Sequence, residues 1–197
     1  YRRQRQMCIR DRFLMAELFE EHDRDRFEWF AFSYGPNVQD AMRERLAASF
    51  DHFIDVREHR DIDVARMSRE LGIDIAVDLK GFTTDQRFGI FAHRCAPVQV
   101  SYLGYPGTTG APYMDYVVAD RVVIPEEETE FFTEKVVYLP HSYQVNDAKR
   151  RISDKVFTRE ELGLPSQGFV FCCFNNNYKI RPLVFVSWMR ILQAVPG

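Results

Sequence analysis

The sequence predicts an α/β protein in which helices cover a parallel β-sheet. Short apolar runs of strand length alternate with segments in which apolar residues recur at helical spacing. This alternation favours parallel pairing, because neighbouring parallel strands need a connection long enough to hold a helix. Apolar residues make up 46% of the chain and charged residues 28%, which is the composition of a globular protein with a buried core.

The first half of the chain is predicted to alternate between helix and strand. Helices are expected where apolar side chains fall three or four residues apart, and strands where short aromatic or β-branched runs end at turn residues. Gly72 stands where a helix commonly ends in the left-handed conformation. In chain order we expect a helix at 13–22, a strand at 27–34, a helix at 38–50, a strand at 53–56, a helix around 64–71 and a strand at 73–79.

The second half continues this alternation and then changes character. A polar stretch at 141–167 is interpreted as a linker, in which Thr158 and Glu161 fit a capping box for a short helix. Because the single strand and helix predicted after it cannot bury their own apolar faces, the chain is expected to be an incomplete piece of a longer protein. The expected elements are a helix at 84–94 capped by Thr83 or Thr84, strands at 98–103, 116–119, 136–139 and 169–174, and a helix at 183–195.

Residues 1–12 differ from the rest of the chain. The string Met7–Arg12 resembles the translation of a library-preparation adapter, a natural basic arm being the alternative, and we exclude residues 1–12 from fold reasoning. Five Arg and one Asp give this segment a formal charge of +4. Since the whole chain has a net charge of −3, residues 13–197 together carry −7. An acidic body does not favour a nucleic-acid partner, and no apolar run approaches the ~20 residues that span a bilayer.

Leu103–Gly110 is a candidate binding loop. It holds three Gly and one Pro directly after a predicted strand. Ligands of open parallel sheets bind at the carboxyl ends of strands, where glycines allow close approach and free N–H groups can donate to a hydroxyl or a phosphate. The alternative interpretation is an ordinary tight turn. The spacing matches neither the dinucleotide nor the nucleoside-triphosphate motif.

A second candidate loop, Phe174–Ile180, follows the last predicted strand. Its three Asn and Lys179 could bind a diphosphate, with the ammonium group opposing the charge of a leaving group. The alternative is a solvated loop with a surface lysine. The five His and four Cys show no metal-ligand spacing, so no metal is expected, and unpaired thiols without a signal peptide favour a cytoplasmic location.

Several motifs, in order along the chain, resemble the catalytic region of the protein O-GlcNAc transferase family. The resemblance covers residues 13–197. It is nearest to bacterial members, because the connection from His141 to Phe169 is short where animal members carry a large insert. The motifs are Asp78–Thr83 with Arg87, Arg94–Gln99, Leu103–Gly110, Met114–Tyr116, Glu134–Lys135, Leu139–His141 and Phe174–Ile180.

The resemblance implies two Rossmann-like domains of the GT-B type. Residues 13–140 would form the first domain, incomplete at its start, and 168–197 the first strand and helix of the second. Members transfer N-acetylglucosamine from UDP-GlcNAc to Ser or Thr hydroxyls of proteins, inverting the anomeric centre without a metal or other cofactor. Tetratricopeptide repeats are expected upstream in the parent chain. The 197-residue polypeptide itself is expected to be inactive, since further uridine contacts would lie beyond it.

The resemblance also implies roles for residues of the first loop. Leu103 and Gly104 match family positions that contact the sugar of the donor. Pro106 and Gly107 match positions that shape this loop. Free backbone N–H groups of such a loop, which Pro106 lacks, are the type of donor that can bind a sugar hydroxyl.

In the second loop, Lys179 matches the family's lysine that contacts the diphosphate and supports the departure of UDP. Asn176 falls where animal members have Gln near the nucleotide, and Tyr178 is a neighbour of that site. Without a metal, the charge that grows on UDP must be met by a cation and N–H dipoles already in place. Lys179 is therefore the predicted catalytic residue.

Three other functions stay open at this point. One is a related glycosyltransferase whose acceptor is not a protein. Another is a nicotinamide-dependent Rossmann oxidoreductase, which the α/β alternation alone would allow, although the chain lacks the glycine fingerprint. The third is a non-catalytic scaffold that keeps the fold.

Overall fold

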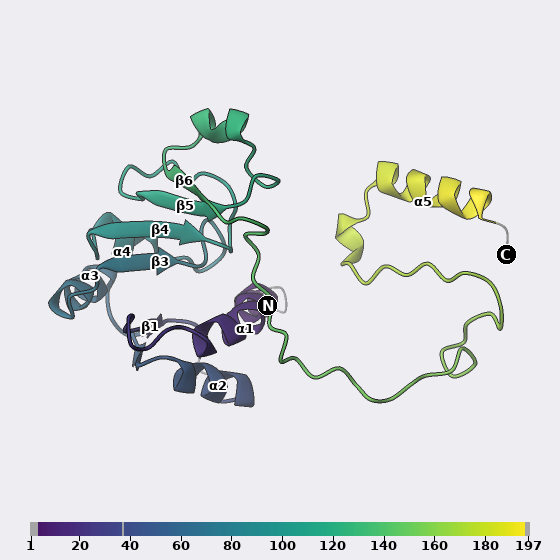
Figure 1. Cartoon of the computed structure of the whole chain (residues 1–197), viewed down its shortest axis with the longest axis horizontal. Coiled ribbons are helices and arrows are strands. Elements are labelled where there is room, and N and C mark those ends of the chain that lie inside the picture. The colour runs from purple at the N-terminus through teal and green to yellow at the C-terminus, as the bar shows by residue number, and fades with distance from the viewer. Residues whose placement is uncertain (1–3, 37, 196–197) are drawn as a thin grey trace. The chain divides into compact units, whose positions relative to one another are not determined.

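The computed structural model of the protein describes residues 4–36 and 38–195 (Figure 1). The chain divides into two compact units, Tyr1–Arg150 and Arg151–Gly197. None of the described helices is both long and apolar enough to cross a bilayer. The first unit holds α1 (Gln4–Glu20), β1 (Phe30–Ser33), α2 (Ala41–Ser49), β2 (His52–Asp55), α3 (Asp61–Glu70), β3 (Ile75–Asp78), α4 (Phe88–Ala92), β4 (Val98–Tyr102), β5 (Tyr116–Ala119), the 3₁₀ helix η1 (Glu126–Phe131) and β6 (Lys135–Tyr138).

The strands of the first unit form two parallel sheets. β1 pairs with β2, and a four-stranded sheet follows in the order β3-β4-β5-β6. In this sheet Asp78 lies opposite Ser101, which in turn lies opposite Val117, so the strands keep their ends close to one level. The α/β class with parallel pairing is confirmed, while a single sheet was expected. Because the four strands are parallel, the loops after β3, β4, β5 and β6 leave the sheet at one edge.

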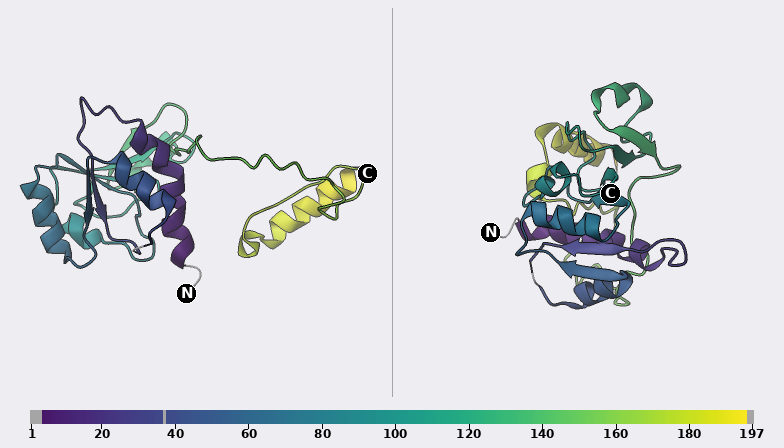
Figure 2. Two further views of the ribbon diagram at one scale, coloured as in Figure 1. Left: turned by 90° about the horizontal axis from the view of Figure 1, so that it is seen from below. Right: turned by 90° about the vertical axis from the view of Figure 1, so that its left-hand side faces the viewer.

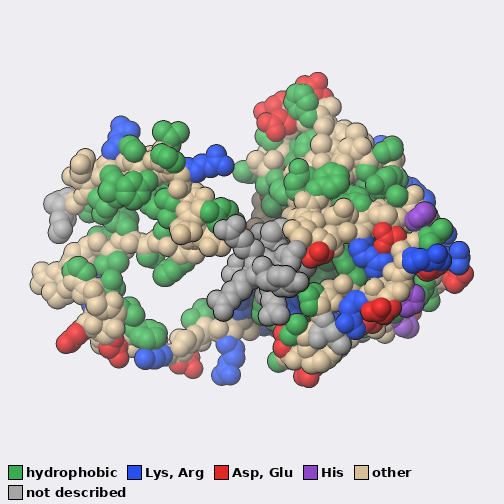
Figure 3. Space-filling view, turned by 180° about the vertical axis from the view of Figure 1, so that it is seen from behind, with side chains coloured by type: hydrophobic (Ala, Val, Ile, Leu, Met, Phe, Trp, Pro, Cys, Tyr) green, Lys and Arg blue, Asp and Glu red, His purple; other side chains and the backbone are tan. Residues whose placement is uncertain are grey.

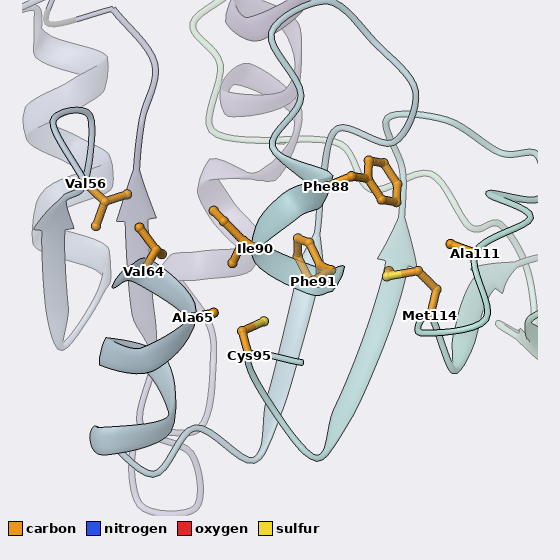
Figure 4. Packing of buried hydrophobic residues seen from close by; sticks show 9 residues of the cluster. All are labelled: Val56, Val64, Ala65, Phe88, Ile90, Phe91, Cys95, Ala111 and Met114. Atoms are coloured by element: carbon orange, nitrogen blue, oxygen red, sulfur yellow. The ribbon is translucent and has the colours of Figure 1, made fainter. Parts of the chain in front are cut away.

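One hydrophobic core joins the two sheets. Phe32 and Ile54 of the two-stranded sheet and Ala76 of β3 all pack against the same buried cluster. Fully burying a side chain the size of phenylalanine contributes about 1.5–3 kcal/mol, so this cluster holds the two sheets as one unit. Its buried members come from the residue after β2, from α3 and α4, from the turn between α4 and β4 and from the segment before β5: Val56, Val64, Ala65, Phe88, Ile90, Phe91, Cys95, Ala111 and Met114 (Figure 4).

A second buried cluster connects α1 to the end of β4. Met15 and Phe19 of α1 pack with Leu103, the residue that follows β4, and Trp29 and Phe50 pack against them. The rings of Phe19 and Phe50 lie 4.6 Å apart between centroids. Figure 2 shows α1 and α2 side by side. The first candidate loop therefore starts from a residue that is fixed by this packing.

Several element boundaries differ from the expected ones. The helix predicted at 84–94 begins only after Arg87, because Asp85 has a left-handed backbone with φ +61° and the side chain of Gln86 accepts the N–H of Phe88 at 2.6 Å. Thr83 and Thr84 are therefore not its caps. Gly72 has φ +71° and follows α3, as predicted. α1 begins at Gln4, within residues 1–12, which were excluded from the fold prediction. The origin of residues 1–12 in an adapter sequence stays a prediction.

Part of the predicted linker is bound to the first unit. Arg45 of α2 donates to Glu20 of α1 at 2.6 Å and to Asp147 at 2.6 Å, and the side chain of Asp147 is fully buried. Lys149 donates to Glu20 at 3.0 Å. Tyr102 Oη donates to the carbonyl oxygen of Tyr143 at 2.7 Å. These bonds fix residues 143–149 against α1, α2 and β4.

The second unit contains η2 (Asn177–Lys179) and α5 (Pro182–Ala194), and the predicted helix is thus confirmed. The strand predicted at 169–174 is wrong: a strand requires a hydrogen-bonded neighbour, and no described residue pairs with this segment. The capping-box bonds between Thr158 and Glu161 form in both directions, at 2.8 and 3.1 Å, but they close a turn rather than a helix. Cys172 and Cys173 are exposed free thiols.

No side chain of α5 is buried within the described residues. Hydrophobic side chains are visible on this unit in Figure 3. Leu183 is 82% exposed and Val186 52% exposed. This agrees with the expectation that one helix does not bury its own apolar residues.

Replacing Arg45 with alanine is expected to lower the free energy of unfolding at pH 7 by about 2 kcal/mol, because Glu20 and Asp147 lose a shared charged donor. Hydrogen bonds from Arg45, against the opposing effect of burial, lower the pKa of Glu20 from 4.5 to about 2. A lowered carboxyl pKa contributes stability that is complete above pH 4.5 and is lost as the pH falls towards 2.

The difference between wild type and Arg45→Ala should therefore shrink between pH 4.5 and pH 2. Urea denaturation followed by far-UV circular dichroism measures it. Arg66→Ala, which removes an exposed guanidinium 3.8 Å from Asp63, is the control and should change stability by less than about 0.5 kcal/mol. A pH-independent difference would contradict the account.

Candidate functional site

The candidate site is built on the carboxyl edge of the four-stranded sheet. β3 ends at Asp78 and continues into residues 79–83. β4 ends at Tyr102 and continues into the candidate binding loop Leu103–Gly110, which we call the glycine-rich loop. Because β3 and β4 are parallel neighbours, the two loops leave the sheet side by side. This is the edge at which open parallel sheets bind ligands.

The glycine-rich loop begins with a strained turn at Leu103. The N–H of Gly104 donates to the carbonyl oxygen of Tyr102 at 2.9 Å, and Leu103 between them has φ +69°. A γ-turn with positive φ at a residue other than glycine is rare and strained. The Leu103 side chain, held by Met15 and Phe19, keeps the turn in place. Leu103 is only 5% exposed, whereas Gly104 is half-buried.

Gly104 brings the two loops into backbone contact. A Cβ atom on Gly104 would overlap the carbonyl oxygen of Leu79 and lie 2.8 Å from the carbonyl oxygen of Lys80. On the other side, Gly81 has φ +56°, and a Cβ there would overlap the Cβ of Tyr105. The loops can interlock only because both positions are glycine.

Asp78 holds the loop after β3. Its carboxylate accepts the backbone N–H groups of Lys80 at 3.1 Å and Gly81 at 2.8 Å. Burial raises the pKa of this carboxyl, although the two backbone hydrogen bonds oppose the shift. These contacts make Asp78 the cap of the loop that follows its own strand.

Glu134 holds the far end of the glycine-rich loop. Its carboxylate accepts the N–H of Thr109 at 2.7 Å, the hydroxyl of Thr108 at 2.7 Å and the hydroxyl of Thr133 at 3.0 Å, and it also accepts the hydroxyl of Thr109. Burial alone would raise the pKa of Glu134, but the hydrogen bonds from Thr109 and Thr108 outweigh it and lower the pKa. Glu134 was not among the predicted site residues. Its place in the Glu134–Lys135 motif was the only signal for it.

The predicted site residues fall into two groups. The first group consists of Leu103, Gly104, Pro106 and Gly107, of which Pro106 is exposed and Gly107 half-buried. The ring of Tyr105 packs over Gly107, and a Cβ atom on Gly107 would lie 2.9 Å from this ring. This group belongs to the first unit.

The other group belongs to the second unit. Asn176 precedes η2, Tyr178 lies within it and Lys179 ends it, with the N–H of Lys179 donating to the carbonyl oxygen of Asn176 at 2.9 Å. Tyr178 is 66% exposed. Lys179 is exposed, and no ion pair of its ammonium group occurs among the residues that the structure describes. One short turn therefore presents an amide, a phenol and a cation together.

Two hollows of the described part lie at the opposite edge of the sheet. Each has a volume of about 350 Å³, and neither is lined by a predicted site residue. In residues 4–36 and 38–195, no three His, Cys, Asp or Glu side chains are grouped as a metal site would require. One hollow is lined by Arg69, Gly72, Ile73, Asp74, Arg94, Ala96 and Pro97, and the other by Pro97, Val98, Pro112, Met114, Asp115, Tyr116, Thr133 and Lys135.

Comparison with known proteins decides the family. The sequence pattern of the family described as "Glycosyl transferase family 41" matches residues 10–155 and 152–197. This chain belongs to glycosyl transferase family 41. The match includes both candidate loops and every predicted site residue, and the resemblance to O-GlcNAc transferases is confirmed.

Relatives of this family member carry glycosyltransferase names. It is 39% identical, over 93% of its length, to the "Probable UDP-N-acetylglucosamine--peptide N-acetylglucosaminyltransferase SEC" of Arabidopsis thaliana, covering 19% of that protein. It is 36% identical, over 75% of its length, to the UDP-N-acetylglucosamine–peptide N-acetylglucosaminyltransferase of Caenorhabditis elegans, covering 13% of it. The chain thus spans at most about a fifth of the length of these relatives.

A solved structure supports the fold of this family 41 chain. The O-GlcNAc transferase of Thermobaculum terrenum, in a mutant form, superposes with a TM-score of 0.65 at 36% identity, over 68% of this chain and 26% of that one. The match supports the predicted GT-B type of catalytic region. None of these similarities favours the oxidoreductase alternative.

Gly104→Ala is expected to destabilise the 197-residue chain by about 2 kcal/mol or more, because the new methyl group overlaps the backbone of Leu79 and Lys80. Gly110→Ala is the control. Gly110 has φ +62° with nothing within 4 Å of its ideal Cβ, so only the backbone strain of about 1 kcal/mol is expected there. Urea denaturation compares the two variants. Equal losses would show that contact between the loops is not what requires Gly104.

Proposed function

We propose that the parent protein of this chain is an inverting glycosyltransferase that moves N-acetylglucosamine from UDP-GlcNAc to Ser or Thr hydroxyls of proteins. The observation that carries the proposal is the family match together with a similarly named relative over 93% of the chain. The loop geometry supports it. A strained turn and interlocked glycines hold backbone donors at the ligand-binding edge of a parallel sheet.

In this proposal the first loop binds the sugar of the donor. Gly104 presents its backbone at the end of β4, while Leu103 anchors the turn from below. Pro106 and Gly107 shape the remainder of the loop. Recognition through backbone groups needs a fixed loop more than particular side chains, which fits the close contacts around Gly104.

The second loop acts on the diphosphate. Lys179 opposes the negative charge that develops on UDP as the glycosidic bond breaks, which is stabilisation of the transition state by a charge already in place. Its exposed ammonium group has no ion-pair partner in the described part of the chain that would have to be displaced. Asn176 and Tyr178 contact the nucleotide. The reaction is proposed to use no metal and no other cofactor.

The wider setting of the parent protein belongs to the same proposal. We expect tetratricopeptide repeats upstream of this segment, a bacterial-type architecture and a cytoplasmic location. The short polar connection between His141 and Phe169 supports the bacterial type. A protein substrate with accessible Ser or Thr residues is the expected acceptor, without a nucleic-acid or membrane partner.

Lys179→Ala in the full-length parent should lower the transfer rate a hundredfold or more, equivalent to ~3 kcal/mol of transition-state stabilisation. The measurement is transfer of radiolabelled N-acetylglucosamine to an acceptor protein under single-turnover conditions. Lys155→Ala is the matched control, since Lys155 is an exposed lysine of the same unit whose ammonium group lies over Phe157. Unchanged rates in Lys179→Ala would place the catalytic cation elsewhere, whereas no transfer by the wild-type parent would indicate a non-catalytic scaffold.

A further inference from the structure

The glycine-rich loop ends in two threonine turns that share one buried carboxylate. The hydroxyl oxygen of Thr108 accepts the N–H of Gly110 at 3.0 Å, and that of Thr109 accepts the N–H of Ala111 at 3.3 Å. Both hydroxyls donate to Glu134, which is 4% exposed. The loop closes by this pattern of hydrogen bonds.

We propose that Glu134 is the positioning residue of the donor-sugar loop, and that its ionised carboxylate selects the loop conformation in which UDP-GlcNAc binds. This inference rests on the proposed function and deepens it. Glu134 itself does not contact the donor. It acts through Thr108 and Thr109, which lie one and two residues beyond Gly107.

The reason for a carboxylate is its hydrogen-bonding direction. An ionised carboxylate only accepts, so both threonine hydroxyls must donate to it, and their lone pairs are left for the N–H groups of Gly110 and Ala111. One oxygen of Glu134 also receives the N–H of Thr109 at 2.7 Å. A neutral amide would place an NH₂ group on one side and leave at least one loop donor or hydroxyl without its partner.

Glu134 completes the restraint of the loop. At the start, Gly104 is pressed against the backbone of Leu79 and Lys80. At the far end, the only buried carboxylate that contacts the loop, within the described residues, is Glu134, which approaches from the residue before β6. The segment between these two points is short and contains Pro106. Loss of the far restraint therefore changes the position of the sugar-binding backbone without disturbing the nucleotide-binding turn of the second unit.

Glu134→Gln in the full-length parent is the main test. The KM for UDP-GlcNAc should rise by about tenfold, while the inhibition constant of UDP, which lacks the sugar, stays within about twofold of wild type. A variant that was only less well folded would lower the amount of active enzyme. It would not change the KM for UDP-GlcNAc relative to the inhibition constant of UDP. Glu127→Gln, at an exposed position of η1, removes the same charge and should change neither constant.

Hydrogen exchange of the 197-residue chain provides a readout that does not depend on activity. In Glu134→Gln, the amides of 104–111 should exchange faster, while those of β4 and β5 keep the wild-type rate. Should this variant fail to fold, Thr109→Ala is used instead. It removes one hydroxyl donor and keeps the N–H bond, so a rise in the KM for UDP-GlcNAc of about threefold is expected.

An unchanged KM for UDP-GlcNAc in the folded variants overturns the positioning role, as does an equal change for UDP and UDP-GlcNAc. Failure of the proposed function looks different. In that case the wild-type parent itself transfers no N-acetylglucosamine, or binds UDP-GlcNAc no better than an unrelated nucleotide sugar, and the inference falls with it.

Discussion

The contact of Gly104 with the backbone of Leu79 and Lys80 is the constraint on which the candidate site depends. Parallel pairing of β3 and β4 brings their carboxyl ends to one edge, and the following loops meet with no room for a side chain. The same contact fixes the γ-turn at Leu103, whose side chain is packed against α1. Packing against α1 and contact with Leu79 and Lys80 thus together fix the orientation of the backbone at Leu103 and Gly104.

The acidic residues at this edge are used for structure. Asp78 accepts two backbone N–H groups, and Asp120 accepts three, from Val122, Val123 and Tyr143 at 2.8–2.9 Å. The carboxylate of Glu134 accepts hydrogen bonds from threonine hydroxyls and from one backbone N–H group. Carboxylates that are committed to loop backbones are poorly placed to transfer protons. In the proposed function, recognition by the first unit therefore falls to backbone donors, and the charge that the reaction requires comes from Lys179 in the second.

Much of this arrangement could be predicted from the sequence. The period of the apolar residues gave the parallel α/β class and nearly every element, including α5 and the left-handed Gly72. It could not give the division into two sheets or the late start of α4, because these depend on tertiary packing and on the left-handed Asp85. The strand at 169–174 was wrong because an apolar run forms a strand only beside a partner. Glycines marked the candidate loop, whereas nothing in the local pattern indicated that a glutamate 25 residues from Thr109 would hold it.

The proposed function requires the Leu103 loop and the Lys179 turn to bind the same donor molecule. Hydrogen exchange of the full-length parent with and without UDP-GlcNAc tests it most directly. The account predicts slower exchange in both 103–110 and 174–180 when UDP-GlcNAc is bound, and in 174–180 alone when UDP is bound. Protection that is absent from 103–110 with the complete donor, or absent from both segments, would contradict it.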